Sequence, residues 1–119
     1  MAVQAVGSRE TRSLDRFTAA AELLQLTRAE QARLLGLSLR TYQRRLQEGR
    51  LEPAEVAAAQ LLPEALDLAT RLFGSGSRAQ RWLTSRVRVL GARPVDLLHD
   101  LEGYKKVEAA LGGAVYGQY

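Results

Sequence analysis

The sequence predicts an all-α protein. Leu supplies 21 and Ala 18 of its 119 residues, whereas β-branched and aromatic residues are few and Pro occurs three times. Leu and Ala have high helix propensity, while β-branched and aromatic side chains favour strands. Apolar residues also recur at helical spacing, with Gly, Ser and Pro between the periodic segments. A chain of this length forms one small domain, or two very small modules that share a core.

The N-terminal part predicts a tail followed by an amphipathic helix. Residues 1–13 mix Gly, Ser, Arg, Gln and small apolar residues without a period, and we expect them to form a flexible tail. From Leu14 onwards, Phe17, Ala21 and Leu24 follow at the spacing of one helical stripe. The first helix is therefore expected to begin at Leu14.

Strong local signals mark the next two helices. Thr27 and Glu30 have the spacing of a capping box, which predicts a helix over residues 28–35. Gly36 is expected to end it in the left-handed conformation, and Ser38 to cap the following helix.

That following helix, over residues 39–48, has two distinct faces. Leu39, Tyr42 and Leu46 recur at helical spacing and are expected to face the core, and Gly49 ends the helix. The opposite face carries Arg40, Gln43, Arg44 and Gln47.

A short helix, a Gly-containing turn and a helix with a basic exposed face together predict a helix-turn-helix unit. An ordinary helical hairpin with a solvated basic face is the alternative. Arg and Gln side chains can form paired hydrogen bonds with base edges, and Arg also contacts phosphates. The candidate DNA-binding residues are Ser38, Arg40, Gln43, Arg44, Arg45 and Arg50.

The second half predicts further helices separated by turns. Pro53 suits the first turn of a long helix that should run from Ala54 to Phe73, and Pro63 should kink or split it near Leu62. The Gly-Ser-Gly-Ser stretch over residues 74–77 is not a phosphate-binding P-loop, because the Lys-Ser/Thr pair and the preceding strand are missing. Its last residue, Ser77, is expected to cap a helix over residues 78–83.

The C-terminal region predicts a helix that begins at Pro94 and a last helix with a stripe formed by Tyr104, Val107 and Leu111. Gly112 and the Gly that follows it are expected to end that helix. The last six residues would then form a flexible peptide that carries two Tyr side chains.

Charge and composition narrow the possible functions. The net charge is +4, and 15 of the 17 basic residues are Arg, concentrated in residues 33–50 and 78–93. The preference for Arg favours nucleic-acid or other anionic partners, and the codon usage of a GC-rich genome is the alternative explanation. The chain has no Cys and a single His, His99, which excludes thiolate chemistry and a His-cluster metal site. No motif pairs a nucleophile with a base, so we expect no catalytic residue, no metal and no cofactor. The sequence also lacks an apolar run long enough for a membrane span and a signal segment, so a cytoplasmic protein is expected.

Two blocks of the sequence resemble the Xre/MbcA/ParS antitoxins. The first block is Leu34-Leu35-Gly36-Leu37-Ser38 followed by Arg40-Thr41-Tyr42-Gln43-Arg44-Arg45-Leu46, with Gly49-Arg50-Leu51 and Glu55. The second contains Phe73-Gly74, Ala79-Gln80-Arg81-Trp82-Leu83, Leu90-Gly91, Pro94, Asp96-Leu97-Leu98, Glu102-Gly103, Val107, Leu111 and Tyr116-Gly117.

The resemblance implies a type II antitoxin whose partner is a RES-domain toxin, an enzyme that consumes NAD or transfers ADP-ribose. It implies a flexible tail (residues 1–13), an Xre-like helix-turn-helix unit (14–52), a connecting helix (53–73) and a toxin-binding domain with a C-terminal plug (74–119). The plug would close the active site of the toxin, and the complex would repress its own operon. The candidate toxin-binding residues are Arg78, Arg81, Tyr116, Gly117, Gln118 and Tyr119.

Two further questions stay open at this level. A stand-alone helix-turn-helix regulator with a C-terminal dimerisation domain is the alternative function, although such a domain has no need of an aromatic tail. Repressors of this size commonly bind two half-sites as dimers, so we expect a homodimer or a larger complex with toxin. The stretch Ala57–Ala59 provides a flat surface either for such a contact or for intramolecular packing.

Overall fold

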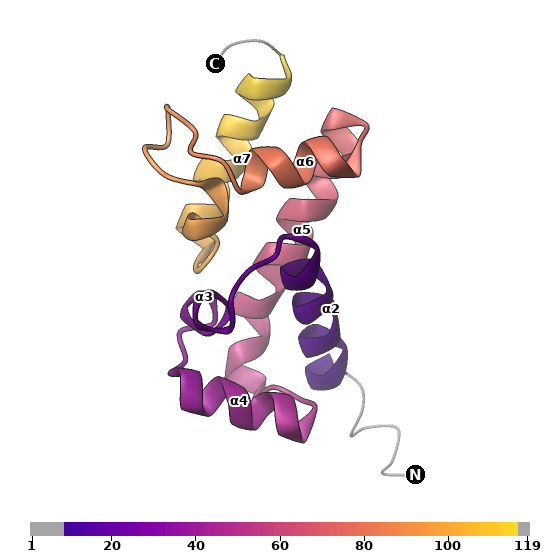
Figure 1. The fold of residues 1–119 in the computed structure, drawn as a ribbon, viewed down its shortest axis with the longest axis vertical. Helices are drawn as coiled ribbons and strands as arrows, with labels where there is room; N and C mark the ends of the chain where they lie inside the picture. The colour runs from indigo at the N-terminus through magenta and orange to yellow at the C-terminus, as the bar shows by residue number, and fades with distance from the viewer. Residues whose placement is uncertain (1–8, 117–119) are drawn as a thin grey trace.

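One long helix forms the centre of the fold. The computed structural model describes residues 9–116, which form six α-helices and two short 3-10 helices (Figure 1). In order, these are α2 (Arg9–Leu23), α3 (Arg28–Leu34), α4 (Leu39–Glu48), η1 (Pro53–Glu55), α5 (Val56–Phe73), α6 (Gly76–Leu83), η2 (Pro94–Leu97) and α7 (Leu101–Val115). Between residues 9 and 116 the only strand-like pairing is an isolated antiparallel bridge from Val87 to Ala92. The predicted all-α class is confirmed.

The central helix, α5, links the two halves of the molecule. It packs against α2 in the N-terminal half and against α6 and α7 in the C-terminal half (Figure 1). A single apolar core extends through both halves and includes Phe17 of α2, Leu62 of α5 and Leu111 of α7, all fully buried. Phe17 also meets Tyr42 of α4 edge to face, with ring centroids 6.3 Å apart. Ala59 belongs to the same core, so this part of the Ala57–Ala59 stretch packs within the chain.

The first described helix begins earlier than the sequence predicts. Helix α2 starts at Arg9 instead of Leu14, so the expected tail over residues 1–13 is helical in its last five positions. Ser13 is buried, and the carbonyl of Glu10 accepts a hydrogen bond from the backbone N–H of Leu51 at 3.3 Å. These tertiary contacts compensate for the weak local signal. Residues 1–8 lie outside the described residues.

Two residues predicted to break helices lie inside continuous helices, so neither helix is split there. Helix α5 continues through Pro63, which is itself buried. Helix α7 continues through Gly112 to Val115, so the predicted stop at the Gly pair is wrong. The lost hydrogen bond at Pro and the poor helix propensity of Gly cost about 3 and about 1 kcal/mol. Packing of both helices into the shared core outweighs these costs.

The turn before α6 differs from the prediction by two residues. Gly74 adopts the left-handed conformation (φ 70°) and ends α5, and Ser75 rather than Ser77 caps the next helix. The Ser75 hydroxyl accepts from the backbone N–H of Arg78 at 3.3 Å, and the Ser77 hydroxyl lies 3.1 Å from that of Ser75. Further along, Pro94 begins the 3-10 helix η2, and α7 has its own cap at Asp100.

Candidate functional site

The turn between α3 and α4 forms as the local signals predict. Thr27 accepts from the backbone N–H of Glu30 at 3.0 Å, and Glu30 accepts from that of Thr27 at 2.8 Å, which completes the capping box. This backbone hydrogen bond is the largest cause that lowers the pKa of Glu30. Gly36 lies in the left-handed region (φ 71°). The Ser38 hydroxyl caps α4 by accepting from the backbone N–H of Thr41 at 3.1 Å.

A buried hydrogen-bond chain holds α4 against α3. The Tyr42 hydroxyl donates to the Gln31 side-chain oxygen at 2.6 Å, and the Gln31 amide donates to the carbonyl of Leu26 at 2.9 Å. Tyr42 is fully buried, and this burial raises the pKa of its hydroxyl to about 12. The phenol therefore stays protonated, and the orientation of α4 relative to α3 is fixed.

The exposed face of α4 contains most of the predicted DNA-binding residues. Arg40, Gln43 and Arg44 are all exposed, and neither Arg forms a salt bridge with another residue between positions 9 and 116. Ser38 is exposed, but its hydroxyl also donates to Thr41 Oγ1 at 3.0 Å, so its first role is the helix cap. Arg50 is exposed beyond the C-terminal end of α4.

Arg45 does not belong to this exposed face. Its Nε and Nη2 donate to the two carboxylate oxygens of Glu55, each at 2.8 Å, and the two side chains are only 11% and 12% exposed. The hydrogen bonds from Arg45 are the largest cause that lowers the pKa of Glu55. Because its guanidinium is occupied, Arg45 ties α4 to η1 and is not available to read bases. Sequence reasoning assigned it to DNA because nothing local identifies Glu55 as its partner.

Leu39 shows the opposite error. Sequence periodicity places it in the core, yet it is 42% exposed and lies on the same side of α4 as Gln43, four residues later. Periodicity alone does not reveal this exposure, because Tyr42 and Leu46 follow Leu39 at the spacing of one helical stripe.

The basic segment over residues 78–93 divides into two kinds of Arg. Arg78, Arg81, Arg86 and Arg88 are exposed, and the guanidinium of Arg78 lies over the Phe73 ring at 5.9 Å. Close by, a shallow apolar cavity of about 400 Å³ lies between this segment and α7. It is lined by Val89, Leu90, Leu97, Lys106, Ala109 and Ala110.

Arg93 is a link between the two halves instead of part of that surface. Its Nη2 donates to Glu30 at 2.7 Å and to Asp96 at 2.9 Å, and its Nε donates to Asp96 at 3.0 Å. Asp96 also lies 3.6 Å from Arg33 of α3. Hydrogen bonds to Asp96 and then to Glu30 raise the pKa of Arg93, so the guanidinium stays charged.

The C-terminal end of α7 leaves an aromatic side chain in solvent. Tyr116 is the C-terminal cap of α7 and is 74% exposed. Of the other predicted toxin-binding residues in this stretch, Gly117, Gln118 and Tyr119 lie outside the described residues.

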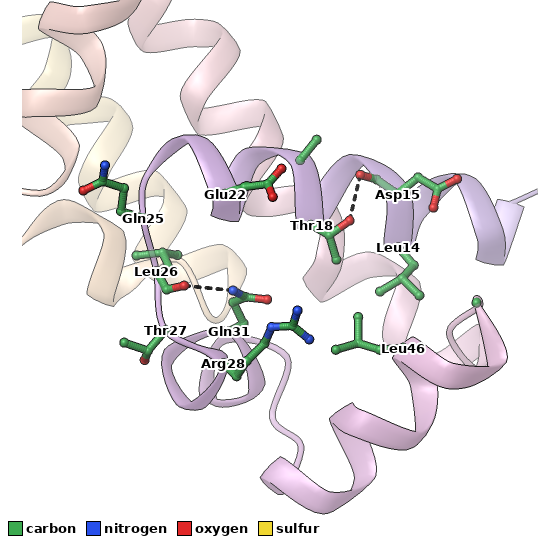
Figure 2. Close-up of a pocket in the computed structure, with 12 residues that line it drawn as sticks. Leu14, Asp15, Thr18, Glu22, Gln25, Leu26, Thr27, Arg28, Gln31 and Leu46 are labelled. Atoms are coloured by element: carbon green, nitrogen blue, oxygen red, sulfur yellow. Dashed lines mark hydrogen bonds between the residues drawn. The ribbon is translucent and has the colours of Figure 1, made fainter.

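A groove of about 830 Å³ lies between α2, the start of α3 and the end of α4 (Figure 2). Its lining includes the apolar Leu14 and Leu46 and the polar or charged Glu22, Gln25 and Arg28. Figure 2 shows the side chain of Arg28 extending between Gln31 and Leu46. None of the lining residues is a His or a Cys. Over residues 9–116, no three His, Cys, Asp or Glu side chains gather as a metal ion would require, and no helix is long and apolar enough to cross a membrane.

Comparisons with known protein families match both halves of the chain. The antitoxin Xre-like helix-turn-helix domain matches residues 13–62, and the antitoxin Xre/MbcA/ParS C-terminal toxin-binding domain matches residues 68–117. A search of curated proteins found no significant match. The first match covers α2 to the middle of α5, including the α4 face, and the second covers α6, the basic segment and α7. The chain therefore belongs to the Xre/MbcA/ParS family of antitoxins, with a helix-turn-helix domain and a toxin-binding domain in one protein.

Proposed function

We propose that this antitoxin binds operator DNA through α4 and neutralises a RES-type toxin with its C-terminal segment. In this proposal it represses its own operon and has no catalytic activity. The observation that carries the DNA-binding part is the exposed face formed by Arg40, Gln43 and Arg44 on a helix fixed by buried contacts. Free guanidinium groups on a rigid element can reach guanine edges and phosphates without breaking existing ion pairs.

The proposal for the toxin rests on the end of α7. Tyr116 is exposed at the C-terminal cap of a packed helix, so its aromatic side chain is presented on a rigid support. Aromatic side chains bury a large area at low cost in rotamer entropy. A segment of this kind suits insertion into the cleft of an NAD-consuming enzyme, where it would exclude the substrate. The exposed Arg78 and Arg81 would contact the toxin nearby.

The DNA-binding part is tested on the promoter fragment upstream of the gene. The Arg40→Ala, Arg44→Ala variant should lose binding, and the slope of log affinity against log salt should fall by about 1 for each phosphate contact removed. A matched control, Arg71→Ala with Lys105→Ala, removes the same charge from exposed positions on α5 and α7. If both variants weaken binding equally, α4 is not the reading helix.

The toxin part is tested by truncation after Val115, the last residue of α7. Removing residues 116–119 leaves the packed helix complete, so the protein should fold and bind promoter DNA as before. NAD turnover by the purified toxin should be inhibited by the full chain and not by the truncated one. Equal inhibition by both would refute the plug, while loss of folding or DNA binding would show that the truncation disturbs more than the plug.

The proposed assembly is a dimer on two half-sites. One recognition helix reads only a few base pairs, and two-fold pairing places two such helices about one DNA turn apart. Light scattering of the free protein and of its DNA complex, together with footprinting, measures both copy number and half-site spacing. A monomer that protects a single unpaired site would contradict it.

A further inference from the structure

Leu39 is the one apolar side chain on the exposed face of α4 as the structure describes that helix. The other exposed residues of α4 are Arg40, Gln43, Arg44, Gln47 and Glu48. Single exposed apolar residues are common on protein surfaces and need no explanation by themselves. Here the position matters, because Leu39 lies within the face proposed to enter the major groove.

The first turn of α4 holds Leu39 in a defined place. Ser38 caps the helix through the backbone of Thr41, so Leu39 is the first residue of the helix and its backbone is fixed. Gln43 follows one turn later on the same side, and Arg40 is its neighbour along the chain. Recognition helices contact base edges mainly with their N-terminal residues. Leu39 therefore lies with Arg40 and Gln43 at the end of the helix closest to the bases.

The major groove contains one apolar group, the 5-methyl group of thymine. Cytosine, guanine and adenine edges present hydrogen-bonding groups, which a Leu side chain cannot satisfy and would desolvate. We propose that Leu39 is a specificity-determining residue that packs against a thymine methyl group beside the bases read by Arg40 and Gln43. This inference rests on the proposed DNA binding through α4 and adds the base type that the first turn selects.

The test removes the methyl group from the DNA and the side chain from the protein separately. The probe is the promoter fragment, narrowed by footprinting to the protected duplex, in which each thymine is replaced in turn by deoxyuridine. At one thymine per half-site this replacement should weaken binding of the unaltered protein about fourfold, which corresponds to ~0.8 kcal/mol for one methyl group. The Leu39→Ala variant should bind the thymine and the deoxyuridine duplexes equally well at that position. The Leu39→Met variant, which keeps a large apolar side chain, should still bind the deoxyuridine duplex more weakly than the thymine duplex.

Leu101 provides a matched control. It is also the first residue of a helix, after the Asp100 side-chain cap, and it is 58% exposed. Leu101→Ala should bind every duplex as the unaltered protein does. Circular dichroism checks that each variant is folded, and we expect both to fold because both Leu side chains are exposed.

The outcomes separate this inference from the proposed function. If no thymine is sensitive to deoxyuridine, or if Leu39→Ala shows the same penalty as the unaltered protein, the thymine contact is refuted while DNA binding stands. If Leu39→Ala binds every duplex more weakly than the unaltered protein by the same factor, including the duplex with deoxyuridine at the sensitive position, Leu39 contacts the sugar-phosphate backbone. This result would also overturn the thymine contact. If the unaltered protein binds no duplex, the proposed DNA binding itself fails.

Discussion

The paired ions Arg45 and Glu55 provide the sharpest test of the structure, because sequence reasoning gave Arg45 a different role. We expect Glu55→Gln to lower the free energy of unfolding by about 2–3 kcal/mol. Each hydrogen bond to a charged group contributes about 1.5–3 kcal/mol, and breaking a fully buried ion pair costs about 3–5 kcal/mol. The value lies at the lower end because the two side chains keep 11% and 12% exposure. Gln also turns an amide donor toward the Arg45 guanidinium where an acceptor is needed.

The assay is urea unfolding followed by circular dichroism at neutral pH. The midpoint should fall with an unchanged slope, since the surface exposed on unfolding is the same. The double variant Arg45→Met, Glu55→Leu should recover most of the loss, because an apolar pair of similar volume is often as stable as a buried ion pair. A loss below about 0.5 kcal/mol in Glu55→Gln would refute the argument, since exposed pairs have energies in that range.

The same pair makes stability depend on pH. The pKa of Glu55 is lower in the folded than in the unfolded protein, where Glu titrates near 4.3. The ionised Glu55 therefore contributes fully to the free energy of unfolding at pH values above the pKa of Glu in the unfolded protein. This contribution is lost as the pH falls through the pKa of Glu55 in the folded protein. Between pH 6 and pH 3 the free energy of unfolding should fall less steeply in Glu55→Gln than in the unaltered protein. Identical slopes would show that the contact with Arg45 does not lower the pKa of Glu55 in the folded protein.

Two further predictions use the same unfolding assay. Tyr42→Phe leaves the oxygen of Gln31 without its buried donor and should cost about 1–3 kcal/mol, and no measurable change would mean that water replaces the hydroxyl. Gly103→Ala should destabilise the protein or prevent folding, because a Cβ there collides with the backbone carbonyl of Leu97. Gly112→Ala is the matched control on the same helix, has nothing within 4 Å of the new Cβ and should stabilise by up to about 1 kcal/mol. Equal effects of the two Ala substitutions would contradict the close approach of α7 to η2.

The parts of the fold that the sequence predicts are those set by neighbours along the chain. The capping box at Thr27, the turn at Gly36 and the cap at Ser38 all form as expected, because each depends on groups within a few residues. The stop predicted at Gly112 fails for the opposite reason. Its local penalty of about 1 kcal/mol is small compared with the packing of α7, and that packing involves residues far away in the sequence.

The candidate binding residues divide in the same way, into those that local sequence predicts and those that depend on distant residues. Exposed residues such as Arg40 and Arg44 are found by helical periodicity alone. The roles of Arg45 and Arg93 depend on carboxylates from other elements. Arg45 pairs with Glu55, and Arg93 pairs with Glu30, which lies 63 residues away in the sequence. An Arg that pairs within the protein and an Arg that binds a partner look alike in a sequence. Only the position of the carboxylate distinguishes them.

Glu30 takes part in both a local and a long-range contact, because its two carboxylate oxygens serve different parts of the fold. One completes the capping box of α3, and the other accepts the hydrogen bond from Arg93 in the C-terminal half. Together with α5, this bridge fixes the N-terminal half against the C-terminal half. In Figure 1, α4 and the C-terminal end of α7 lie toward opposite ends of the long axis. The surfaces proposed for DNA and for toxin therefore lie toward opposite ends of the molecule and are joined by the Glu30–Arg93 bridge and α5.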